Sequence, residues 1–407
     1  FDRYNFTVNE AEPLEKEVAI DPEMLGKVFE NLIEENRRKG LGSFYTPREI
    51  VHYMCQESII SYLDTSLNTA EESVVPVKPK QAKLFGQPEP EQTSLKITVR
   101  REIIPRGDIE TFVHLGEQIS HYEAVETKYR IKMPKNIEQH ARLIDEKLAN
   151  ITICDPAVGS GAFPVGMMTE IVRARSSLTP YFNDVHDRTP YHFKRHAIQN
   201  CLYGVDIDPG AVEIAKLRLW LSLVVDEEDV KQIKPLPNLD YKVVTGNSLL
   251  GVEKTLYNEK LFRKLEELKP LYFDEPDKAK KAQYKQQIDE TIHELTNGKE
   301  VFDFEIYFSE VFHRKGGFDA VVANPPYGLV FDTSIKKKYE SSYQTFARNN
   351  DLYVAFYQRG VELSKRGGQL TYISPNTFLN GDYFKKLRLF LTTSTLLRTI
   401  WDYKSIP

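Results

Sequence analysis

Apolar and polar positions follow two different periods along most of this chain. Five short apolar runs begin at residues 151, 201, 241, 318 and 367, and turns or stretches with helical spacing separate them. Such runs indicate buried strands, whereas apolar residues three or four positions apart indicate helices. Their alternation predicts an α/β fold with a doubly wound, mostly parallel sheet.

Two of the predicted helical stretches lie between these strands. Residues 209–225 are expected to bury Leu217, Leu221 and Val224, which stand in register on one face. Residues 252–300 are rich in Lys, Glu and Gln and also have helical spacing. We interpret them as a solvated helical excursion.

The chain before residue 150 has a different character. A helix is predicted at residues 21–40, and a second follows Thr46-Pro47 directly. Residues 65–148 are rich in Pro, Gln and charge, which indicates an insertion with modest structure and a strand near 94–105. Residues 396–403 are expected to form a last core strand. The predicted division is an N-terminal helical segment (1–64), the insertion (65–148) and a core (149–407).

Composition narrows the function classes. Of 407 residues, 41% are hydrophobic and 28% charged, as in an ordinary globular protein. No apolar run approaches the roughly 20 residues of a membrane span, so no membrane partner is expected. The net charge of −5 gives no general attraction to a polyanion. Cys55, Cys154 and Cys201 stand far apart, which favours reduced thiols in a cytoplasm, and no Cys or His cluster predicts a metal site.

The stretch DPAVGSGAF, residues 155–163, joins a predicted strand to a predicted helix. Gly159 and Gly161 allow close backbone approach, and the start of the helix supplies N–H donors. Pro164 stands where the G-x-G-x-x-G pattern has its last glycine, which disfavours a dinucleotide. With Asp155 ahead of the glycines, the turn favours a ligand that bears a cationic or zwitterionic tail. The alternative is a plain tight turn.

Two further strand ends carry polar side chains. In GVDIDP, residues 204–209, Asp206 is expected to accept hydrogen bonds from both ribose hydroxyls of an adenosyl group, and Asp208 to cap the next helix. In TGNS, residues 245–248, Asn247 either hydrogen-bonds an adenine edge or forms an Asx turn.

The stretch VVANPPYG, residues 321–328, is the most specific signal. Two prolines hold Asn324 and Tyr327 stiffly at the C-terminal edge of a strand. An amino group on an aromatic ring is a poor nucleophile because its lone pair is delocalised. The side-chain oxygen of Asn324 and the carbonyl oxygen of Pro325 can accept hydrogen bonds from its N–H groups. They can thereby stabilise the positive charge that grows on the nitrogen during group transfer. The alternative is a Pro-rich turn with a structural Tyr.

Together these motifs resemble those of class I S-adenosylmethionine-dependent methyltransferases of the adenine-N6 DNA type, which have a Rossmann-like core. DPAVGSG resembles the cofactor motif and NPPY the catalytic motif. FYTP, residues 44–47, resembles the motif on the methionine side, and its place before the glycine loop is the gamma arrangement. SPNTF, residues 374–378, resembles the segment whose aromatic residue stacks on the flipped base. The insertions look similar to those of type IIG restriction–modification proteins.

The resemblance implies S-adenosyl-L-methionine as cofactor and double-stranded DNA with a flipped adenine as partner. It also implies a location in a bacterial or archaeal cytoplasm. The residues expected to serve catalysis are Asn324, Pro325, Pro326, Tyr327 and Phe378. The residues expected to bind the cofactor are Phe44, Tyr45, Thr46, Asp155, Pro156, Ala157, Gly159, Gly161, Asp206, Ile207, Asn247, Ser248 and Asn324.

Other parts of the enzyme are expected outside this sequence. The chain begins at Phe1 without Met, so we interpret it as a piece of a longer protein. A target-recognition domain would follow it and a nuclease domain would precede it, and this piece alone should bind specific DNA poorly. Lys336, Lys337, Lys338 and Arg348 either meet phosphates or form a solvated face.

Two other functions compete with DNA methylation. A protein glutamine methyltransferase faces the same chemical problem at an amide nitrogen. The N-terminal FYTP, Phe378 and the length of the chain argue against it. The other alternative is a non-catalytic, cofactor-binding specificity module, and the intact Asn324 and Tyr327 argue against that.

Overall fold

The computed structural model describes residues 46–68, 70–76, 94–100, 102–124, 131–224, 237–251, 259–296, 298, 302–328, 333–347 and 350–402. The predicted helix at residues 21–40 lies outside this part of the chain. So do Phe44, Tyr45 and Arg348.

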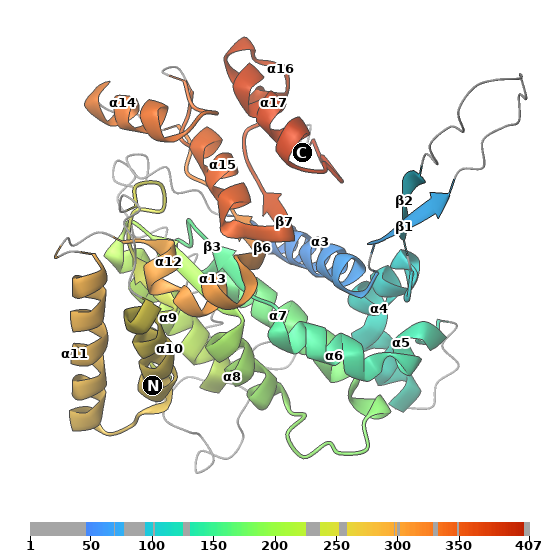
Figure 1. Cartoon of the computed structure of the whole chain (residues 1–407). Helices are drawn as coiled ribbons and strands as arrows, with labels where there is room; N and C mark the ends of the chain where they lie inside the picture. The colour runs from blue at the N-terminus through green and yellow to red at the C-terminus, as the bar shows by residue number, and fades with distance from the viewer. Residues whose placement is uncertain are drawn as a thin grey trace, which may run out of the picture.

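Within the described residues, the central sheet has five strands in the order β5–β4–β3–β6–β7 (Figure 1). They are β3 (Ile153–Asp155), β4 (Leu202–Asp206), β5 (Val243–Thr245), β6 (Phe318–Ala323) and β7 (Ser364–Tyr372). Every adjacent pair is parallel, which confirms the predicted α/β class. The chain builds outward from β3 through β4 to β5 and then returns to the other side of β3, so the strand order reverses between β3 and β6.

Helices cover both faces of this sheet because successive strand residues point to opposite sides. Ile153 and Val322 belong to one large hydrophobic cluster, whereas Cys154 and Val321 belong to another. Helices that contact the strands on the first face are α3 (Arg48–Leu67), α7 (Ala162–Ser177) and α9 (Pro209–Val224). Those on the second face are α12 (Phe304–Tyr307), α13 (Ser309–Lys315) and α15 (Tyr353–Leu363).

The region expected to be an insertion differs from that expectation over residues 102–124 and 131–148. Its helices are α4 (Arg106–Ala124), α5 (Lys135–Gln139) and α6 (Ala141–Asn150). Ile104, Phe112 and Ile144 are almost fully buried in the same cluster as α3 and α7. These residues therefore belong to the main core. Only the antiparallel pair β1 (Ala70–Pro76) and β2 (Ser94–Arg100) projects from the body in Figure 1, and β2 confirms the strand predicted there.

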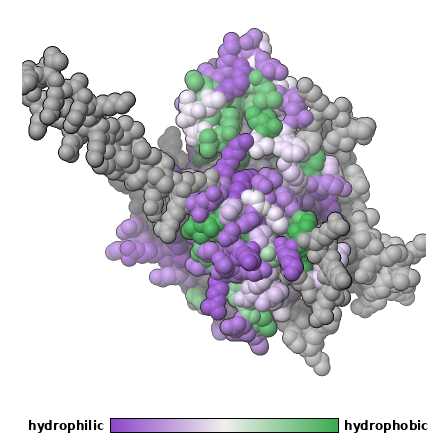
Figure 2. All heavy atoms as spheres, turned by 90° about the vertical axis from the view of Figure 1, so that its right-hand side faces the viewer, coloured by the Kyte–Doolittle hydropathy of each residue, from purple (hydrophilic) through white to green (hydrophobic). Residues whose placement is uncertain are grey.

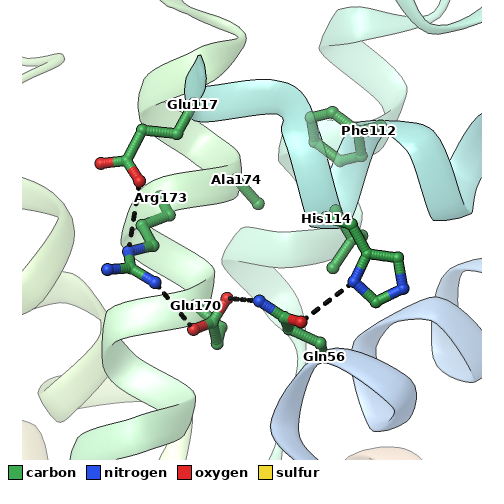
Figure 3. Close-up of a pocket in the computed structure, with 8 residues that line it drawn as sticks. Gln56, Phe112, His114, Glu117, Glu170, Arg173 and Ala174 are labelled. Carbon is green, nitrogen blue, oxygen red and sulfur yellow. Dashed lines mark hydrogen bonds and ion pairs between the residues drawn. The ribbon is translucent and has the colours of Figure 1, made fainter. Parts of the chain in front are cut away.

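A network of polar side chains connects α3, α4 and α7. Glu170 on α7 has a side chain only 1% exposed, and it accepts hydrogen bonds from Gln56 Nε2 (3.0 Å) and Arg173 Nη1 (3.2 Å). His114 on α4 lies 3.0 Å from Gln56 Oε1, so all three helices share the network (Figure 3). The adjoining cavity of about 30 Å³ has room for about one water molecule.

The helix predicted after residue 209 forms, but with a different buried face. Leu217 is 37% exposed, and the buried positions are Val212, Ala215, Leu219 and Leu223. The expectation for Leu217 was therefore wrong, whereas Leu221 is partly buried. The reason is that α9 packs against α7 and β5 and lies under the glycine loop, where Ala215 fits and a larger residue would not.

The excursion at residues 252–300 contains α10 (Glu259–Asp274) and α11 (Lys278–Leu295), which lie side by side in Figure 1. Leu265 and Ile288 are fully buried between them. This pair also buries Tyr241 and Ile306, so it is attached to the sheet domain by a small core of its own. The remaining helix on this side is α8 (Pro190–Asn200), which Thr189 caps.

The expected strand at residues 396–403 was wrong, since residues 396–402 have no regular structure. Leu396, Ile400 and Trp401 are 81%, 55% and 60% exposed. The segment makes no backbone ladder with β7, and a strand without such a partner leaves its N–H and C=O groups unpaired. Hydrophobic surface gathers in the upper part of Figure 2, where this segment, α16 (Thr377–Asn380) and α17 (Lys385–Ser394) lie in Figure 1. The helix α14 (Thr333–Ser342) precedes them in the chain.

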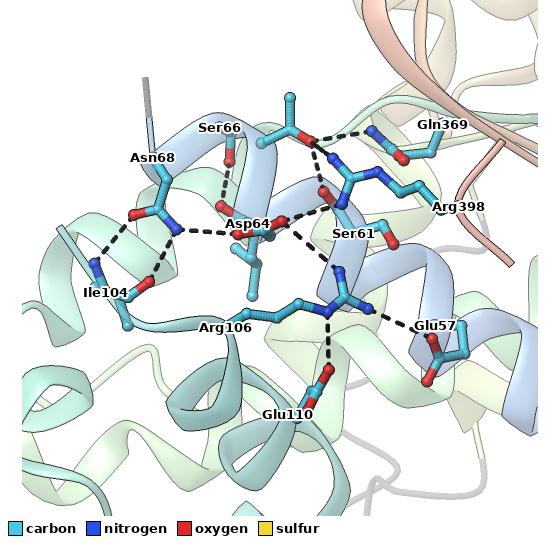
Figure 4. A network of polar contacts seen from close by, with 12 residues as sticks. Glu57, Ser61, Asp64, Ser66, Asn68, Ile104, Arg106, Glu110, Gln369 and Arg398 are labelled. Atoms are coloured by element: carbon cyan, nitrogen blue, oxygen red, sulfur yellow. Dashed lines mark hydrogen bonds and ion pairs between the residues drawn. The ribbon is translucent and has the colours of Figure 1, made fainter. Parts of the chain in front are cut away.

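Side chains instead hold this last segment against α3. Asp64 has a side chain 1% exposed and accepts hydrogen bonds from Arg398 Nη1 (3.0 Å) and Asn68 Nδ2 (3.0 Å). Arg106 Nη1 of α4 lies 3.7 Å from the same carboxylate (Figure 4). The Asn68 side chain also pairs with the backbone of Ile104, so one buried carboxylate ties together α3, the start of α4 and the C-terminal segment.

Two further expectations concern compartment and membrane. In the described part of the chain, no helix is long and apolar enough to cross a membrane. Cys55, Cys154 and Cys201 are all buried.

Replacing Asp64 with Ala is expected to lower the free energy of unfolding by about 1–3 kcal/mol, because Arg106, Arg398 and Asn68 lose a charged acceptor. Urea denaturation measures the change. The matched control is Glu110→Ala, which removes an exposed carboxylate from the same Arg106 and should cost less than about 0.5 kcal/mol. Equal effects of the two substitutions would contradict the assignment of Asp64 as the organising group.

Candidate active site

Four polar motifs meet at one edge of the sheet. Asp155, Asp206 and Thr245 are the last residues of β3, β4 and β5, and Asn324 directly follows β6. Because the strands are parallel, all of these ends lie on the same edge. The strand order reverses between β3 and β6, and in open α/β sheets a ligand crevice forms at such a reversal.

Asp155 is the most unusual group at this edge. The residue is 2% exposed, and its Oδ1 accepts a hydrogen bond from the Ala157 backbone N–H (3.0 Å). Its Oδ2 is buried and has no hydrogen-bond partner among the described residues. Burial raises the pKa of Asp155 well above its usual range, and the nearby Asp206 raises it further. A cationic donor placed beside Oδ2 would therefore stabilise the ionised form strongly.

The glycine loop is fitted closely to the structure behind it. Gly161 has φ +87° and precedes α7, and a Cβ there would lie 2.9 Å from that of Ala215. Gly159 also has a positive φ (+49°), but its Cβ would meet nothing within 4 Å. Arg218 on α9 is buried and donates to the Ser160 carbonyl oxygen (2.9 Å). The loop is thus held by α9 at Ser160 and Gly161 and is open at Gly159. This arrangement suits a ligand that approaches the backbone at Gly159.

Asp206 is shared between two turns. Its Oδ2 accepts from the Gly159 N–H (2.8 Å) and its Oδ1 from the Asp208 N–H (2.9 Å). Burial raises the pKa of this carboxyl group as well. Asp208 accepts from the Gly210 N–H (2.9 Å) in the first turn of α9, which confirms its predicted capping role. Ile207, between the two carboxylates, is 61% exposed and presents apolar surface beside the loop.

The TGNS turn makes mainly local contacts. Asn247 Oδ1 accepts from the backbone N–H groups of Leu249 (2.9 Å) and Leu250 (3.1 Å), which is the turn that the sequence left open as an alternative. Ser248 is buried and donates to the Pro156 carbonyl oxygen (2.6 Å), so it fastens this turn to the glycine loop. A contact of either side chain with adenine stays a prediction.

The NPPY motif meets the FYTP motif across 278 residues of chain. Asn324 Nδ2 donates to Thr46 Oγ1 at 3.1 Å, and Thr46 is 7% exposed. Pro325 is buried. This hydrogen bond directs the amide nitrogen of Asn324 toward Thr46. The carboxamide oxygen is therefore directed away from Thr46.

The two aromatic residues predicted to stack on a base pack on one hydrophobic cluster. Tyr327 and Phe378 are both half-buried against it. Burial raises the pKa of Tyr327, so its hydroxyl stays protonated. Tyr357 on α15 supports Phe378 with ring centroids 5.5 Å apart, and its hydroxyl lies 2.9 Å from Ser374 Oγ.

Sequence reasoning missed Arg218 and Tyr357. The signal for Arg218 was a charged residue within the largely apolar stretch LRLWLSL. Tyr357 carried no signal, because one aromatic residue on an apolar helix is usually a core residue. No group of three or more His, Cys, Asp or Glu side chains that could hold a metal occurs within the described part.

Comparison with known proteins fits this geometry. Residues 200–407, just over half of the chain, match the family described as Eco57I restriction-modification methylase. The chain belongs to this family. The recognition drawn from the motifs, a likeness to the methyltransferase part of type IIG restriction–modification proteins, is confirmed.

Several curated relatives are longer than this member of the family. A provisional type II restriction enzyme and methyltransferase of Methanocaldococcus jannaschii is 28% identical over 98% of this chain and 37% of its own length. The type II restriction enzyme and methyltransferase RM.Eco57I of Escherichia coli is 27% identical over 77% of this chain and 27% of its own. The adenine-specific methyltransferase PglX of Streptomyces coelicolor is 28% identical over 58% and 18%. The chain thus spans well under half the length of these relatives.

Solved structures are also similar to this chain. The match to one of them, the cryo-EM structure of a DrdV–DNA complex, covers 91% of this chain and 24% of that chain, with 13% identity and a TM-score of 0.41.

Gly161→Ala is expected to lower the free energy of unfolding by about 2–4 kcal/mol. It adds both a left-handed non-glycine residue and an overpacked contact with Ala215. Gly159→Ala, the matched control, should cost only about 1 kcal/mol, since its Cβ meets open space. Urea denaturation of both variants gives the difference. Equal losses of stability in the two variants would contradict the close contact between residue 161 and Ala215.

Proposed function

We propose that this chain transfers a methyl group from S-adenosylmethionine to the N6 amino group of adenine in DNA, as the methyltransferase part of a restriction–modification protein. The observation that carries this proposal is the hydrogen bond between Asn324 and Thr46. It joins the NPPY and FYTP motifs at the sheet edge that also holds Asp155 and the glycine loop. The family match and the names of the relatives support the same reaction and substrate class.

The residues present suit the proposed cofactor. The unpartnered Oδ2 of Asp155 is an acceptor for a buried cation, and the methionine part of the cofactor carries an ammonium group. Each oxygen of Asp206 already accepts one backbone N–H and has further lone pairs for ribose hydroxyls. The exposed Ile207 offers apolar surface to the adenine ring. When bound, the cofactor supplies an electrophilic methyl group on a sulfonium.

The chemical task of the chain is to make a weak nucleophile reactive. The Asn324 carboxamide oxygen and the Pro325 carbonyl oxygen accept hydrogen bonds from the two N–H groups of the target amino group. These acceptors stabilise the positive charge that develops on nitrogen as the new N–C bond forms. The hydrogen bond from Asn324 to Thr46 and the rigid prolines hold the acceptors in place beforehand, so little reorganisation remains for the reaction itself.

Tyr327 and Phe378 provide the proposed seat for the base. An adenine inside a duplex is stacked and paired, so the enzyme must extract it before transfer. Both rings pack on the cluster that contains Tyr353 and Phe356. Stacking against them would return about 1–3 kcal/mol per contact. Lys337 and Lys338 on α14 are exposed and could meet the phosphates of the DNA backbone.

Recognition of the DNA sequence and cleavage are functions that we assign to other parts of the full protein. The relatives named as restriction enzymes and methyltransferases are much longer than this chain. We therefore propose that a target-recognition domain, and a nuclease domain where one is present, accompany this part in its natural context.

Asp206→Ala should weaken S-adenosylmethionine binding by about 1–3 kcal/mol, the scale for the loss of a charged hydrogen-bond partner. Isothermal calorimetry measures the affinity directly. Asp208→Ala is the matched control, because it removes a neighbouring carboxylate that only caps α9, and it should leave affinity within about twofold while lowering stability by about 1 kcal/mol. Unchanged affinity in the Asp206 variant would overturn the ribose assignment.

Asn324→Ala should lower the rate of methylation by about a hundredfold or more and keep cofactor affinity. The reason is that the Asn324 oxygen acts on charge that develops only during methyl transfer. Mass spectrometry of DNA incubated with the protein and labelled cofactor gives the rate. Activity within tenfold of the original would rule out the catalytic role.

A paired substitution at Thr46 tests how Asn324 is held. Thr46→Val keeps the shape but removes the hydroxyl, whereas Thr46→Ser keeps the hydroxyl. If the hydroxyl orients Asn324, the Val variant should lose about tenfold in kcat and the Ser variant should stay close to the original. Equal losses in both would mean that Thr46 acts through packing alone.

A further inference from the structure

A second cavity, of about 310 Å³, lies at the opposite edge of the sheet from the proposed active site. Its lining includes Thr152, which precedes β3, Lys242, which precedes β5, and Lys315, which ends α13 shortly before β6. Residues of α6, α8, α10 and α13 also line it. Asp155, Asp206 and Asn324 stand at the other ends of the same strands, so the sheet separates the two sites.

The floor of this cavity has one carboxylate for two buried ammonium groups. Lys269 Nζ lies 3.1 Å from Glu310 Oε2, and Lys242 Nζ lies 3.5 Å from Glu310 Oε1. The side chains of Lys269, Lys242 and Glu310 are 8%, 15% and 18% exposed. Burial alone would raise the pKa of Glu310, but Lys269 and Lys242 outweigh it and lower that pKa to about 2. The carboxylate is therefore ionised at neutral pH, and one positive charge is left over.

The rest of the lining contains further charges and hydrogen-bond donors. Arg314 and Lys315 also line the cavity, but Arg314 Nη2 lies 3.9 Å from Glu266 Oε2 and Lys315 Nζ lies 2.7 Å from the buried carboxylate of Asp319. The excess of positive charge is therefore at Lys242 and Lys269, which share Glu310. His196 Nδ1 is buried and has no hydrogen-bond partner among the described residues. Burial lowers the pKa of His196, so its ring is neutral and can donate one hydrogen bond.

Aromatic side chains give the cavity an apolar wall. Tyr203, Tyr241, Tyr272 and Phe273 line it, and all four are at most 6% exposed. Lys242 Nζ lies 4.0 Å from the centre of the Tyr203 ring and donates to the Tyr203 hydroxyl (2.8 Å). Burial lowers the pKa of Lys242, which shows that Glu310 does not fully compensate this ammonium group. An added anion would compensate it.

We propose that this cavity is a binding site for a small organic anion, a carboxylate or phosphate group on a compact planar apolar body. The charged head would lie against Lys242 and Lys269, and the apolar body against Tyr241 and Phe273. A volume of about 310 Å³ stands at the lower end of the range for small-molecule sites, so the ligand is smaller than a nucleotide cofactor. The site is independent of methyl transfer in composition and in position.

The test uses the 407-residue chain and three probes: benzoate, phenyl phosphate and inorganic phosphate. Isothermal calorimetry at fixed ionic strength, set with chloride, should give saturable binding of benzoate or phenyl phosphate and weaker binding of inorganic phosphate, which lacks the apolar body. Lys242→Met should lower the affinity at least about tenfold, the effect of removing one charged hydrogen-bond donor. Lys264→Met, an exposed lysine on α10 outside the cavity, should leave it unchanged.

A second variant covers the case in which Lys242→Met fails to fold. Glu310→Gln removes the competing carboxylate and keeps its shape, so it should raise the affinity for the organic probes severalfold. Absence of saturable binding by both organic probes to the unmodified chain overturns the proposal. So does binding that is equal in the Lys264 and Lys242 variants, or that Glu310→Gln weakens. Binding of S-adenosylmethionine in the same samples stays as in the unmodified protein, which separates this result from the proposed function.

Discussion

The pairing of β3 with β6 is the interaction on which the rest of this structure depends. Ile153 faces Ala320 and Cys154 faces Val321, although more than 160 residues of chain separate them. Each strand ends at the same edge, and the helices that follow leave toward opposite faces of the sheet. The ends of β3 and β6 therefore stay uncovered, and Asp155 and Asn324 come to the same edge as neighbours.

This edge contains polar groups that a stable core would normally avoid. Asp155 is buried with a raised pKa. A buried carboxylate of this kind costs free energy and persists only where the surroundings hold it. Here Arg218 and Ser248 fasten the loop from behind, and the apolar clusters on both faces of the sheet fix the strands.

The two ends of the same sheet have opposite electrostatic character. Carboxylates and an amide stand at the carboxyl ends of the strands, where burial and the nearby Asp206 raise the pKa of Asp155. Lysines stand at the amino ends, where Lys242 and Lys269 share Glu310. A cationic group is therefore favoured at the first edge and an anionic group at the second.

The sequence by itself determined the elements whose signals are local. The strands, the glycine turn, the cap at Asp208 and the rigid NPPY segment follow from short-range patterns, and the family was recognised from the resemblance of these motifs to known ones. Tertiary structure decided what depends on distant partners: that residues 102–124 and 131–148 belong to the core, that residues 396–402 form no strand, and that α9 buries Ala215 rather than Leu217. The hydrogen bond from Asn324 to Thr46 and the charge balance around Glu310 belong to this second group. Burial and pairing are set by which segments meet in space, and a local pattern contains no record of that.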